Sequence, residues 1–316
     1  MSYIVGVDIG GTKCAVCLGS SEGEVFDRRE IDTDPGEEPE RILGRLCEHA
    51  KSILRDRTVQ MQSLKGVGVS CGGPLDSATG MILSPPNLPL WIKVPAGDIL
   101  RGEFPDINVV LENDANATAL AEWKFGAGRG CVNMLYLTMG TGIGCGMILD
   151  GRLYHGTNDL AGEAGHQTIL LNGPMCKCGK KGCLEALSSG PAIAHLAQDS
   201  LHYGRGKHLV EKAGGNPANI TAKLVVECAK EGDAFSIRIL EEAGFYMGVG
   251  LSNLIQILNP EKIVLGTIAV HAGDLILNPI RDTLKEYTWA RSLSVCEVVP
   301  AELGDRAQDL AAIALI

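Results

Sequence analysis

Apolar residues are arranged along the chain in two ways, as short runs rich in valine and isoleucine and as longer stretches with helical spacing. Short runs predict buried strands, and apolar residues three or four positions apart predict helices that bury one face. In the N-terminal third the pattern predicts strands at 3–9, 13–18, 24–31, 66–70 and 109–112 and a helix at 41–54. The segment SPPNLP at 84–89 is excluded from a helix interior, because proline lacks an amide proton and restricts the residue before it.

The pattern of strands then starts again. Strands are expected at 134–138, 143–149, 263–265 and 295–299, and helices at 184–197, 274–287 and 305–315. The spacing from Phe235 to Leu258 predicts one long helix or two in tandem, and residues 204–219 predict a mobile surface excursion. Twice a glycine-rich turn joins two strands, and later strands alternate with helices. The chain is therefore predicted to form two α/β lobes of related topology.

The composition is that of a globular chain. Its 316 residues favour two domains, and its apolar content of 45% is typical of a packed core rather than of a disordered segment. The formal net charge of −10 disfavours nucleic acids and anionic membrane surfaces as partners. The chain has no apolar run of the ~18 residues that a membrane span requires, and its N-terminus reads as a strand rather than a signal peptide. We therefore expect a cytoplasmic protein with no nucleic-acid or membrane partner.

Two glycine-threonine turns, Asp8–Thr12 (DIGGT) and Thr138–Gly142 (TMGTG), each join a pair of predicted strands. The Walker A and GxGxxG fingerprints are absent. Glycine lets backbone amides converge on an anion without a Cβ in the way, and threonine adds a hydroxyl donor. Either turn alone is also explained as an ordinary hairpin. The pair, one in each lobe, predicts two loops that close on one polyphosphate, and Asp8 could hold Mg²⁺ through water.

Asp114 stands where the strand at 109–112 gives way to an alanine-rich helix. One interpretation is a helix N-cap, for which aspartate is among the preferred residues. The other is a carboxylate that the helix N-terminus keeps ionised and that accepts the proton of an attacking hydroxyl during phosphoryl transfer. The two interpretations are compatible.

One histidine and three cysteines, His166, Cys176, Cys178 and Cys183, lie close together in the sequence. Such a set suits a closed, tetrahedral Zn²⁺ site with a structural role, and neighbouring lysines would favour the thiolates. The alternative is three buried free thiols. A zinc ion here would pin a loop that carries Glu163 and Glu185. These carboxylates and the second nitrogen of His166 could then bind sugar hydroxyls.

With these motifs, the chain resembles the ROK family of sugar kinases and sugar-responsive repressors, within the actin-like ATPase superfamily. The resemblance runs nearly end to end and is greatest to the glucokinase and N-acylmannosamine kinase branch. It rests on the two turns, on Glu112–Ala117 (ENDANA), on Glu163–His166 (EAGH) and on Cys176–Glu185 (CKCGKKGCLE). The fold it implies is α/β, with two ribonuclease-H-like lobes around a central cleft and a zinc-binding loop at 163–185. The implied lobes are residues 1–118, against which a closing helix at 302–316 packs, and residues 119–301.

The resemblance also implies a role for each matching residue. Asp114 is the general base. The sugar is bound by Gly73, Asn87, Asn113, Asp114, Glu163, His166 and Glu185. ATP and Mg²⁺ are bound by Asp8, Gly10, Gly11, Thr12, Lys13, Gly140, Thr141, Gly142 and Gly266, with Gly266 against the adenosine. The structural zinc is held by His166, Cys176, Cys178 and Cys183. The family is usually dimeric or tetrameric, so a homodimer or homotetramer is expected.

The sequence departs from the family pattern at two points. The family usually has a Gly-Gly pair after the strand at 263–265, whereas this chain has Gly266-Thr267, and the added Cβ is expected to narrow the adenosine site. The choice of phosphate donor is therefore open. Gln308 stands where a glycine is common, which is expected to alter close helix packing.

Several functions remain possible for such a chain. An ATP-dependent sugar kinase accounts for all the motifs, with glucose as the first choice because residues 86–91 (PNLPLW) resemble the glucokinase segment. Other hexoses and N-acetylhexosamines, such as N-acetylmannosamine and N-acetylglucosamine, are the alternatives. A ROK repressor carries a helix-turn-helix ahead of the kinase-like part, for which a first strand at Tyr3 leaves no room. A non-enzymatic sugar sensor, or a kinase with an unusual donor, would explain Gly266-Thr267. A zinc-ribbon module would explain the cysteines but not the turns.

Overall fold

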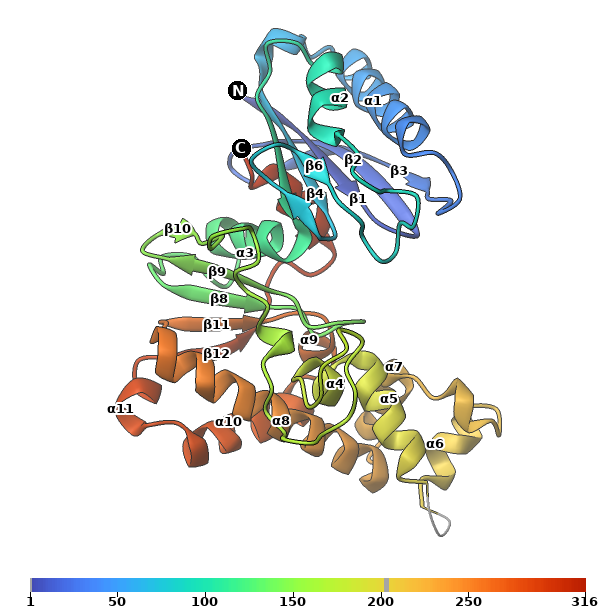
Figure 1. The fold of residues 1–316 in the computed structure, drawn as a ribbon, viewed down its shortest axis with the longest axis vertical. Helices are drawn as coiled ribbons and strands as arrows, with labels where there is room; N and C mark the ends of the chain where they lie inside the picture. The colour runs from blue at the N-terminus through green and yellow to red at the C-terminus, as the bar shows by residue number, and fades with distance from the viewer. Residues whose placement is uncertain (1, 202–204) are drawn as a thin grey trace.

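The computed structural model describes residues 2–201 and 205–316, and two α/β lobes are stacked along its long axis (Figure 1). The N-terminal lobe contains a five-stranded sheet in the order β3-β2-β1-β4-β7. Its strands are β1 (Tyr3–Ile9), β2 (Lys13–Ser20), β3 (Val25–Asp32), β4 (Leu64–Cys71) and β7 (Val109–Asn113). The first three strands are antiparallel, and β4 and β7 run parallel to β1. A short hairpin, β5 (Leu75–Asp76) and β6 (Met81–Ile82), lies outside the sheet.

The C-terminal lobe repeats this plan. Its sheet has the order β10-β9-β8-β11-β12. The strands are β8 (Met134–Leu137), β9 (Cys145–Leu149), β10 (Arg152–Leu153), β11 (Lys262–Leu265) and β12 (Glu297–Pro300). Again three antiparallel strands are followed by two that run parallel to the first. The predicted mixed α/β fold with a repeated topology agrees with this arrangement.

Strands β1, β2 and β4 are buried almost throughout because both faces of this part of the sheet are covered, whereas the edge strand β3 is polar and half exposed. Val5 and Val7 of β1 pack in one core cluster with Ile42 of helix α1 (Pro39–Asp56). Ile4 packs in another with Leu310 of helix α12 (Ala307–Ile313). Helix α2 (Ala96–Glu103) packs beside α1. The last helix of the chain therefore completes the core of the first lobe, and both chain ends lie there (Figure 1).

Helix α3 (Asp114–Phe125) lies between the two sheets (Figure 1). It contacts β8 and β9 on one side and α12 on another. Ala119 belongs to the core cluster that includes Tyr136, whereas Ala121 belongs to the cluster that includes Leu310. Alanine suits this position because a small side chain allows close packing in more than one direction. The predicted lobe boundary between residues 118 and 119 falls within this helix.

The remaining helices belong to the second lobe. They are α4 (Glu185–Ser188), α5 (Gly190–Asp199), α6 (Lys207–Lys212), α7 (Ala222–Lys230), α8 (Ala234–Leu258), α9 (Ile268–Ala272), α10 (Asp274–Tyr287) and α11 (Ala290–Leu293). Of the two possibilities for the stretch from Phe235 to Leu258, the single helix α8 is observed. Within the described residues, no helix has the length and apolar character needed to cross a membrane.

One expectation about the second lobe is wrong. The helical stretch at 184–197 is two helices, because Ser189 has an extended backbone and its side chain caps α5 by accepting the amide of Ala192. The segment at 204–219, of which residue 204 lies outside the described residues, lies mostly at the surface, as predicted. It is ordered into α6, whose Leu209 is fully buried, and a 3₁₀ turn at Pro217–Asn219, and its mobility stays a prediction.

Candidate active site

The first glycine-threonine turn connects β1 to β2 at the edge of the N-terminal sheet that faces the other lobe. Asp8 stands near the end of β1, paired in the sheet with Ser70 of β4. Burial, together with the nearby negative charges of Asp114 and Asp309, raises the pKa of Asp8 to about 7. A buried carboxylate crowded by other carboxylates fits a cation such as Mg²⁺, which prefers oxygen ligands.

The second turn, which connects β8 to β9, is held by hydrogen bonds from three separate segments. The amide of Gly190, at the start of α5, donates to the Gly140 carbonyl at 2.7 Å. The amide of Met139 donates to the Thr267 hydroxyl oxygen at 2.8 Å. The amide of Ile143 donates to Glu185 Oε2 at 2.9 Å. The turn is thus fixed before any ligand binds.

Helix α3 begins at Asp114, but its N-cap is Asn113. The Asn113 side-chain oxygen accepts the amides of Ala115 at 2.9 Å and Asn116 at 3.4 Å. The capping interpretation of Asp114 is therefore wrong in position, because the residue before it makes the cap. Within the described residues, Asp114 Oδ1 accepts one hydrogen bond, from the adjacent amide of Ala115 at 2.8 Å. The side chain is exposed to the cleft, but the surrounding protein removes part of its hydration, and this desolvation raises the pKa of the carboxyl.

A buried network behind the start of α3 was not anticipated from the sequence. Glu112 Oε1 accepts the Asn113 amide and the Asn116 side chain, both at 2.9 Å. Glu112 Oε2 lies 2.7 Å from His155 Nε2, and this contact raises the pKa of His155. The network fixes the junction between β7 and α3. His155 is distant in sequence and belongs to no motif, so no signal in the sequence identified it.

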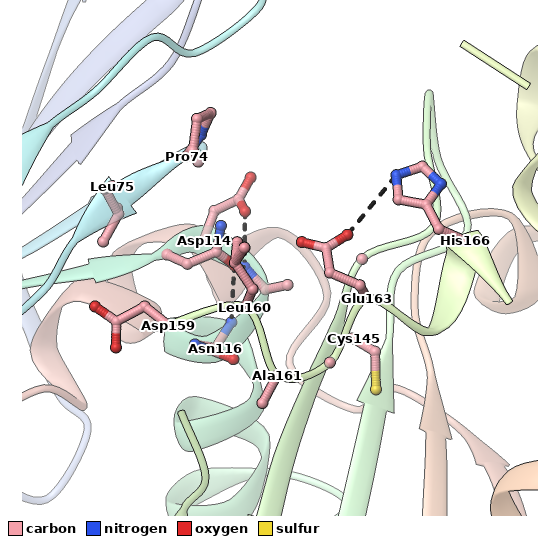
Figure 2. Close-up of a pocket in the computed structure, with 15 residues that line it drawn as sticks. Pro74, Leu75, Asp114, Asn116, Cys145, Asp159, Leu160, Ala161, Glu163 and His166 are labelled. Carbon is pink, nitrogen blue, oxygen red and sulfur yellow. Dashed lines mark hydrogen bonds and ion pairs between the residues drawn. The ribbon is translucent and has the colours of Figure 1, made fainter. Parts of the chain in front are cut away.

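Six of the seven residues predicted to bind a sugar line one cavity of about 350 Å³, here called the Glu163 cavity. They are Gly73, Asn87, Asp114, Glu163, His166 and Glu185. The seventh, Asn113, lines an adjoining pocket of about 270 Å³ together with Asp114, Glu163 and His166. Figure 2 shows Asp114 and the Glu163–His166 pair around this pocket, with Pro74 and Leu75 contributed by the N-terminal lobe.

A second cavity of about 680 Å³, here called the Thr267 cavity, lies between the first sheet, the second turn and α9. Of the residues predicted to bind ATP and Mg²⁺, it is lined by Asp8, Gly10, Gly140, Thr141 and Gly266. Gly11 and Gly142 line the Glu163 cavity instead. A Cβ on Gly142 would lie 2.6 Å from Glu185 Oε2, so a larger residue there would require this carboxylate to shift. Asp114 and Thr141 line both cavities.

Two predicted residues are not among those that line either cavity. Lys13 pairs with Glu30 of the neighbouring strand β3, and its side chain is exposed. Thr12 accepts the amide of Thr33 through its carbonyl oxygen at 2.8 Å. Both support the first turn from outside.

The two departures from the family pattern both lie at the Thr267 cavity. A Cβ on Gly266 would lie 2.4 Å from the Tyr136 hydroxyl, so the glycine that is retained cannot be replaced without a shift. Thr267 is exposed and lines the cavity. Gln308 also lines it and is exposed, so the expected effect of this side chain on helix packing is wrong.

The predicted zinc ligands lie together. One ligand atom from each of His166, Cys176, Cys178 and Cys183 can be chosen so that all lie within 4.8 Å of one another. His166 Nδ1 is 3.7 Å from Cys176 Sγ, and Cys178 Sγ is 3.7 Å from Cys183 Sγ. Atoms bound at ~2.0–2.3 Å to a tetrahedral zinc are separated by such distances. With Nδ1 in this cluster, His166 Nε2 is left on the side of Glu163, 3.7 Å from its Oε2. The donor set and its spacing thus fit a zinc ion.

Two stacked lobes of the same topology, each with a glycine-threonine turn at a shared cleft, define the actin-like class of ATPase folds. Within that class the chain belongs to the ROK family, whose sequence profile matches residues 4–316.

Comparison with known proteins gives the same family. The chain is 35% identical to a glucokinase from Halalkalibacterium halodurans, over 96% of this chain and 92% of that protein. A crystal structure of a ROK family glucokinase from Streptomyces griseus, in complex with glucose and AMPPNP, superimposes with a TM-score of 0.82 at 29% identity, over 99% of each chain. The chain is also 30% identical to a xylose repressor from Caldicellulosiruptor bescii, over 99% of this chain and 77% of the repressor. The family therefore includes relatives of two functional classes.

Proposed function

We propose that this protein is an ATP-dependent hexose kinase that transfers the terminal phosphoryl group of ATP to the 6-hydroxyl of glucose. The observation that carries the proposal is the position of Asp114. Its carboxylate lines both the Glu163 cavity and the Thr267 cavity, so it stands where an acceptor in one would meet a phosphoryl donor in the other. The glucokinase relatives, one of them in complex with glucose and AMPPNP, support this pairing of ligands.

Asp114 is proposed as the general base. A base must accept the proton of the attacking hydroxyl, and only the ionised carboxylate can do so. Among the described residues, Asp114 makes a single recorded hydrogen bond through Oδ1, to the Ala115 amide, which leaves Oδ2 available to a substrate hydroxyl. Partial desolvation raises its pKa, which brings it nearer to neutral pH and makes it a stronger base than a fully hydrated aspartate. Proton transfer to this carboxylate accompanies the in-line transfer of the phosphoryl group.

The Glu163 cavity is proposed to bind the sugar. Its wall combines three carboxylates, one imidazole and one amide, which accept hydrogen bonds from hydroxyls or donate hydrogen bonds to them. Asn113 completes the set through its side-chain NH₂, because its oxygen already caps α3. Glucose remains the first choice. N-acetylmannosamine, N-acetylglucosamine and other hexoses are the alternative acceptors.

The Thr267 cavity is proposed to bind MgATP. The amides of the two turns would bind the phosphates, and Asp8 would hold Mg²⁺, which neutralises charge on the transferred phosphoryl group when bound. The cysteine-histidine cluster is proposed to hold a structural zinc ion. Such an ion would fix the loop that carries Glu163 and Glu185, and with it the sugar-binding side chains.

A sugar sensor without kinase activity is the second candidate. The observation in its favour is the 30% identity to a xylose repressor over nearly the whole chain. The intact acids Asp8 and Asp114 favour the kinase, because a sensor needs neither a metal-binding carboxylate nor a base at the junction of two cavities.

A coupled assay of ADP release with MgATP distinguishes the two candidates. Zinc-replete protein is tested against glucose, other hexoses and N-acetylhexosamines. We expect turnover with glucose and at least tenfold lower kcat/KM with the others, since a site built to bind a hydroxyl discriminates strongly against its absence. Sugar binding measured by calorimetry without turnover of any sugar would contradict the kinase and support the sensor.

A further inference from the structure

Thr267 has a backbone conformation that its side chain disfavours. It follows β11 and precedes α9, with φ +49° and ψ −107°. A positive φ is a genuine outlier for a β-branched residue, because the branched Cβ crowds the backbone. Such strain costs energy and persists where the surroundings impose it, often at ligand sites. The residue lines the cavity proposed to bind nucleotide, so the strain calls for an explanation there.

The side chain of Thr267 holds the second glycine-threonine turn. Its Oγ1 accepts the amide of Met139 at 2.8 Å, while the Met139 carbonyl accepts the amide of Ile268 at 3.2 Å. Both backbone groups of Met139 are therefore bound by the segment after β11. A glycine at 267 would relieve the backbone but leave the Met139 amide without this acceptor.

The same hydroxyl retains a proton to donate. Oγ1 acts as acceptor toward Met139, and within residues 2–201 and 205–316 no acceptor is recorded for its proton. The side chain is exposed toward the cavity. A Cβ added to Gly140 would lie 3.8 Å from Oγ1, which places the hydroxyl beside the second turn. The amides of Met139, Gly140 and Ile143 are bonded within the protein. Those of Thr141 and Gly142 have no bonded partner among the described residues. The free proton thus lies next to a turn with two amides that an anion could bind.

We propose that Thr267 is a nucleotide-binding residue whose hydroxyl donates a hydrogen bond to an oxygen of the β- or γ-phosphate of the donor, while its oxygen holds the Met139 amide. The contact is with the phosphate chain rather than with the base, because it lies at the turn. Hydrogen bonds to charged acceptors are the strong ones, which offsets the strain of the backbone. This inference rests on the proposed assignment of the Thr267 cavity to a nucleotide.

Three substitutions separate the hydroxyl from the backbone. Thr267→Ser keeps the hydroxyl, Thr267→Val keeps the branched shape without it, and Thr267→Gly removes both. Binding of MgATP, MgADP and AMP to the whole protein is measured by calorimetry, with folding checked by circular dichroism. We expect Thr267→Val and Thr267→Gly to weaken the binding of MgATP and MgADP about tenfold. AMP, which lacks the β- and γ-phosphates, should change less than about twofold, and Thr267→Ser should bind all three like wild type.

Val270→Ala is the matched control. Val270 lines the same cavity from α9, the helix that Thr267 precedes, and its side chain offers only apolar contact. Its truncation should therefore leave the ratio of MgATP to AMP affinity unchanged. If Thr267→Val lost equal affinity for AMP and MgATP, the assignment of the hydroxyl contact to the phosphate chain would be overturned. Unchanged or tighter MgATP binding in folded Thr267→Gly would overturn the hydroxyl contact altogether. If wild type binds nucleotides in the expected pattern but phosphorylates no sugar, the proposed kinase function fails and the Thr267 contact stands.

Discussion

The two glycine-threonine turns occupy equivalent places in two sheets of the same topology, yet their surroundings differ. The strand that leads into the first turn carries Asp8, a buried acid close to Asp114. At the equivalent place before the second turn stands Thr138, which is neutral. The second turn is in addition held by Gly190, Thr267 and Glu185. Repetition of a topology therefore does not repeat its chemistry.

The difference suggests a division of labour. The N-terminal lobe supplies the acids, which suit a cation and the proton of an attacking hydroxyl. The C-terminal lobe supplies a turn that is fixed in advance and offers neutral donors to phosphate. Preorganised donors stabilise developing charge without reorganisation during the reaction. Each substitution below tests one side of this division.

Asp114→Asn should have the largest effect. Removal of the base should lower kcat by about 10²–10⁴-fold, the usual contribution of acid–base catalysis. Desolvation raises the pKa of Asp114 in the folded protein, so ionisation at pH 7 opposes folding. Because the side chain is exposed, solvent screens this effect, and the neutral amide should raise Tm only slightly. Steady-state kinetics and calorimetry measure the two effects.

Asp106→Asn, at an exposed position, is the matched control and should change neither quantity. The wild-type kcat should also fall on acidification, with a midpoint above the ~3.9 of an exposed aspartate. Near-normal turnover of Asp114→Asn would show that the base lies elsewhere and would contradict the claim that the N-terminal lobe supplies the catalytic acids.

Asp8→Asn and Thr138→Val test the equivalent positions directly. Loss of a carboxylate that holds a metal ion through water typically lowers activity by about 10–100-fold. Asp8→Asn should therefore lower kcat by that factor and raise the Mg²⁺ concentration needed for half-maximal rate. Thr138→Val should lower kcat by only about 2–10-fold, which is the effect of losing one neutral hydrogen bond. Magnesium titrations at saturating ATP measure both. Equal effects of the two substitutions would contradict the division between a charged and a neutral turn.

Cys178→Ser tests whether the cysteine-histidine cluster supports the second turn. Loss of one ligand should release the zinc ion, lower Tm and loosen the loop that carries Glu185. Because Glu185 binds the Ile143 amide beside the second turn, we expect KM for the sugar to rise up to about tenfold with a smaller change for ATP. Metal analysis and kinetics are the measurements.

Cys131→Ser, outside the cluster, serves as the control, since this thiol is not among the four clustered ligands. A Cys178→Ser protein that keeps its zinc and its sugar KM would show that the cluster does not support the site.

Local patterns were enough to predict much of the fold and part of the site. The strands, the two turns and the cysteine-histidine set depend on short-range spacing. The main strands and both turns are observed near their predicted positions and the four side chains lie together, whereas phosphate and zinc binding stay predictions. The N-cap of α3 was misplaced by one residue, because Asn113 and Asp114 are both good capping residues and only the backbone distinguishes them. Residues whose roles depend on distant segments could not be found.

The Glu112–His155 pair and the bond from Met139 to Thr267 are examples of such distant contacts. Each joins segments that adopt their relation only when the sheets form. A departure from the family pattern did point to Thr267, but as an obstruction to the nucleotide rather than as a support for the turn. The hydroxyl bond that gives the residue this second role is visible only in three dimensions.

The packing of α12 on β1 and β4 has a consequence for synthesis on the ribosome. The strands of the first sheet are complete once residue 113 has been made, but the helix that covers Ile4 and Cys17 ends at residue 313. At roughly 5–20 residues per second, about 200 further residues take roughly 10–40 s. During that time one face of the newborn sheet has no cover. We expect this interval, rather than the finished fold, to be when the protein is most prone to aggregate and most dependent on chaperones.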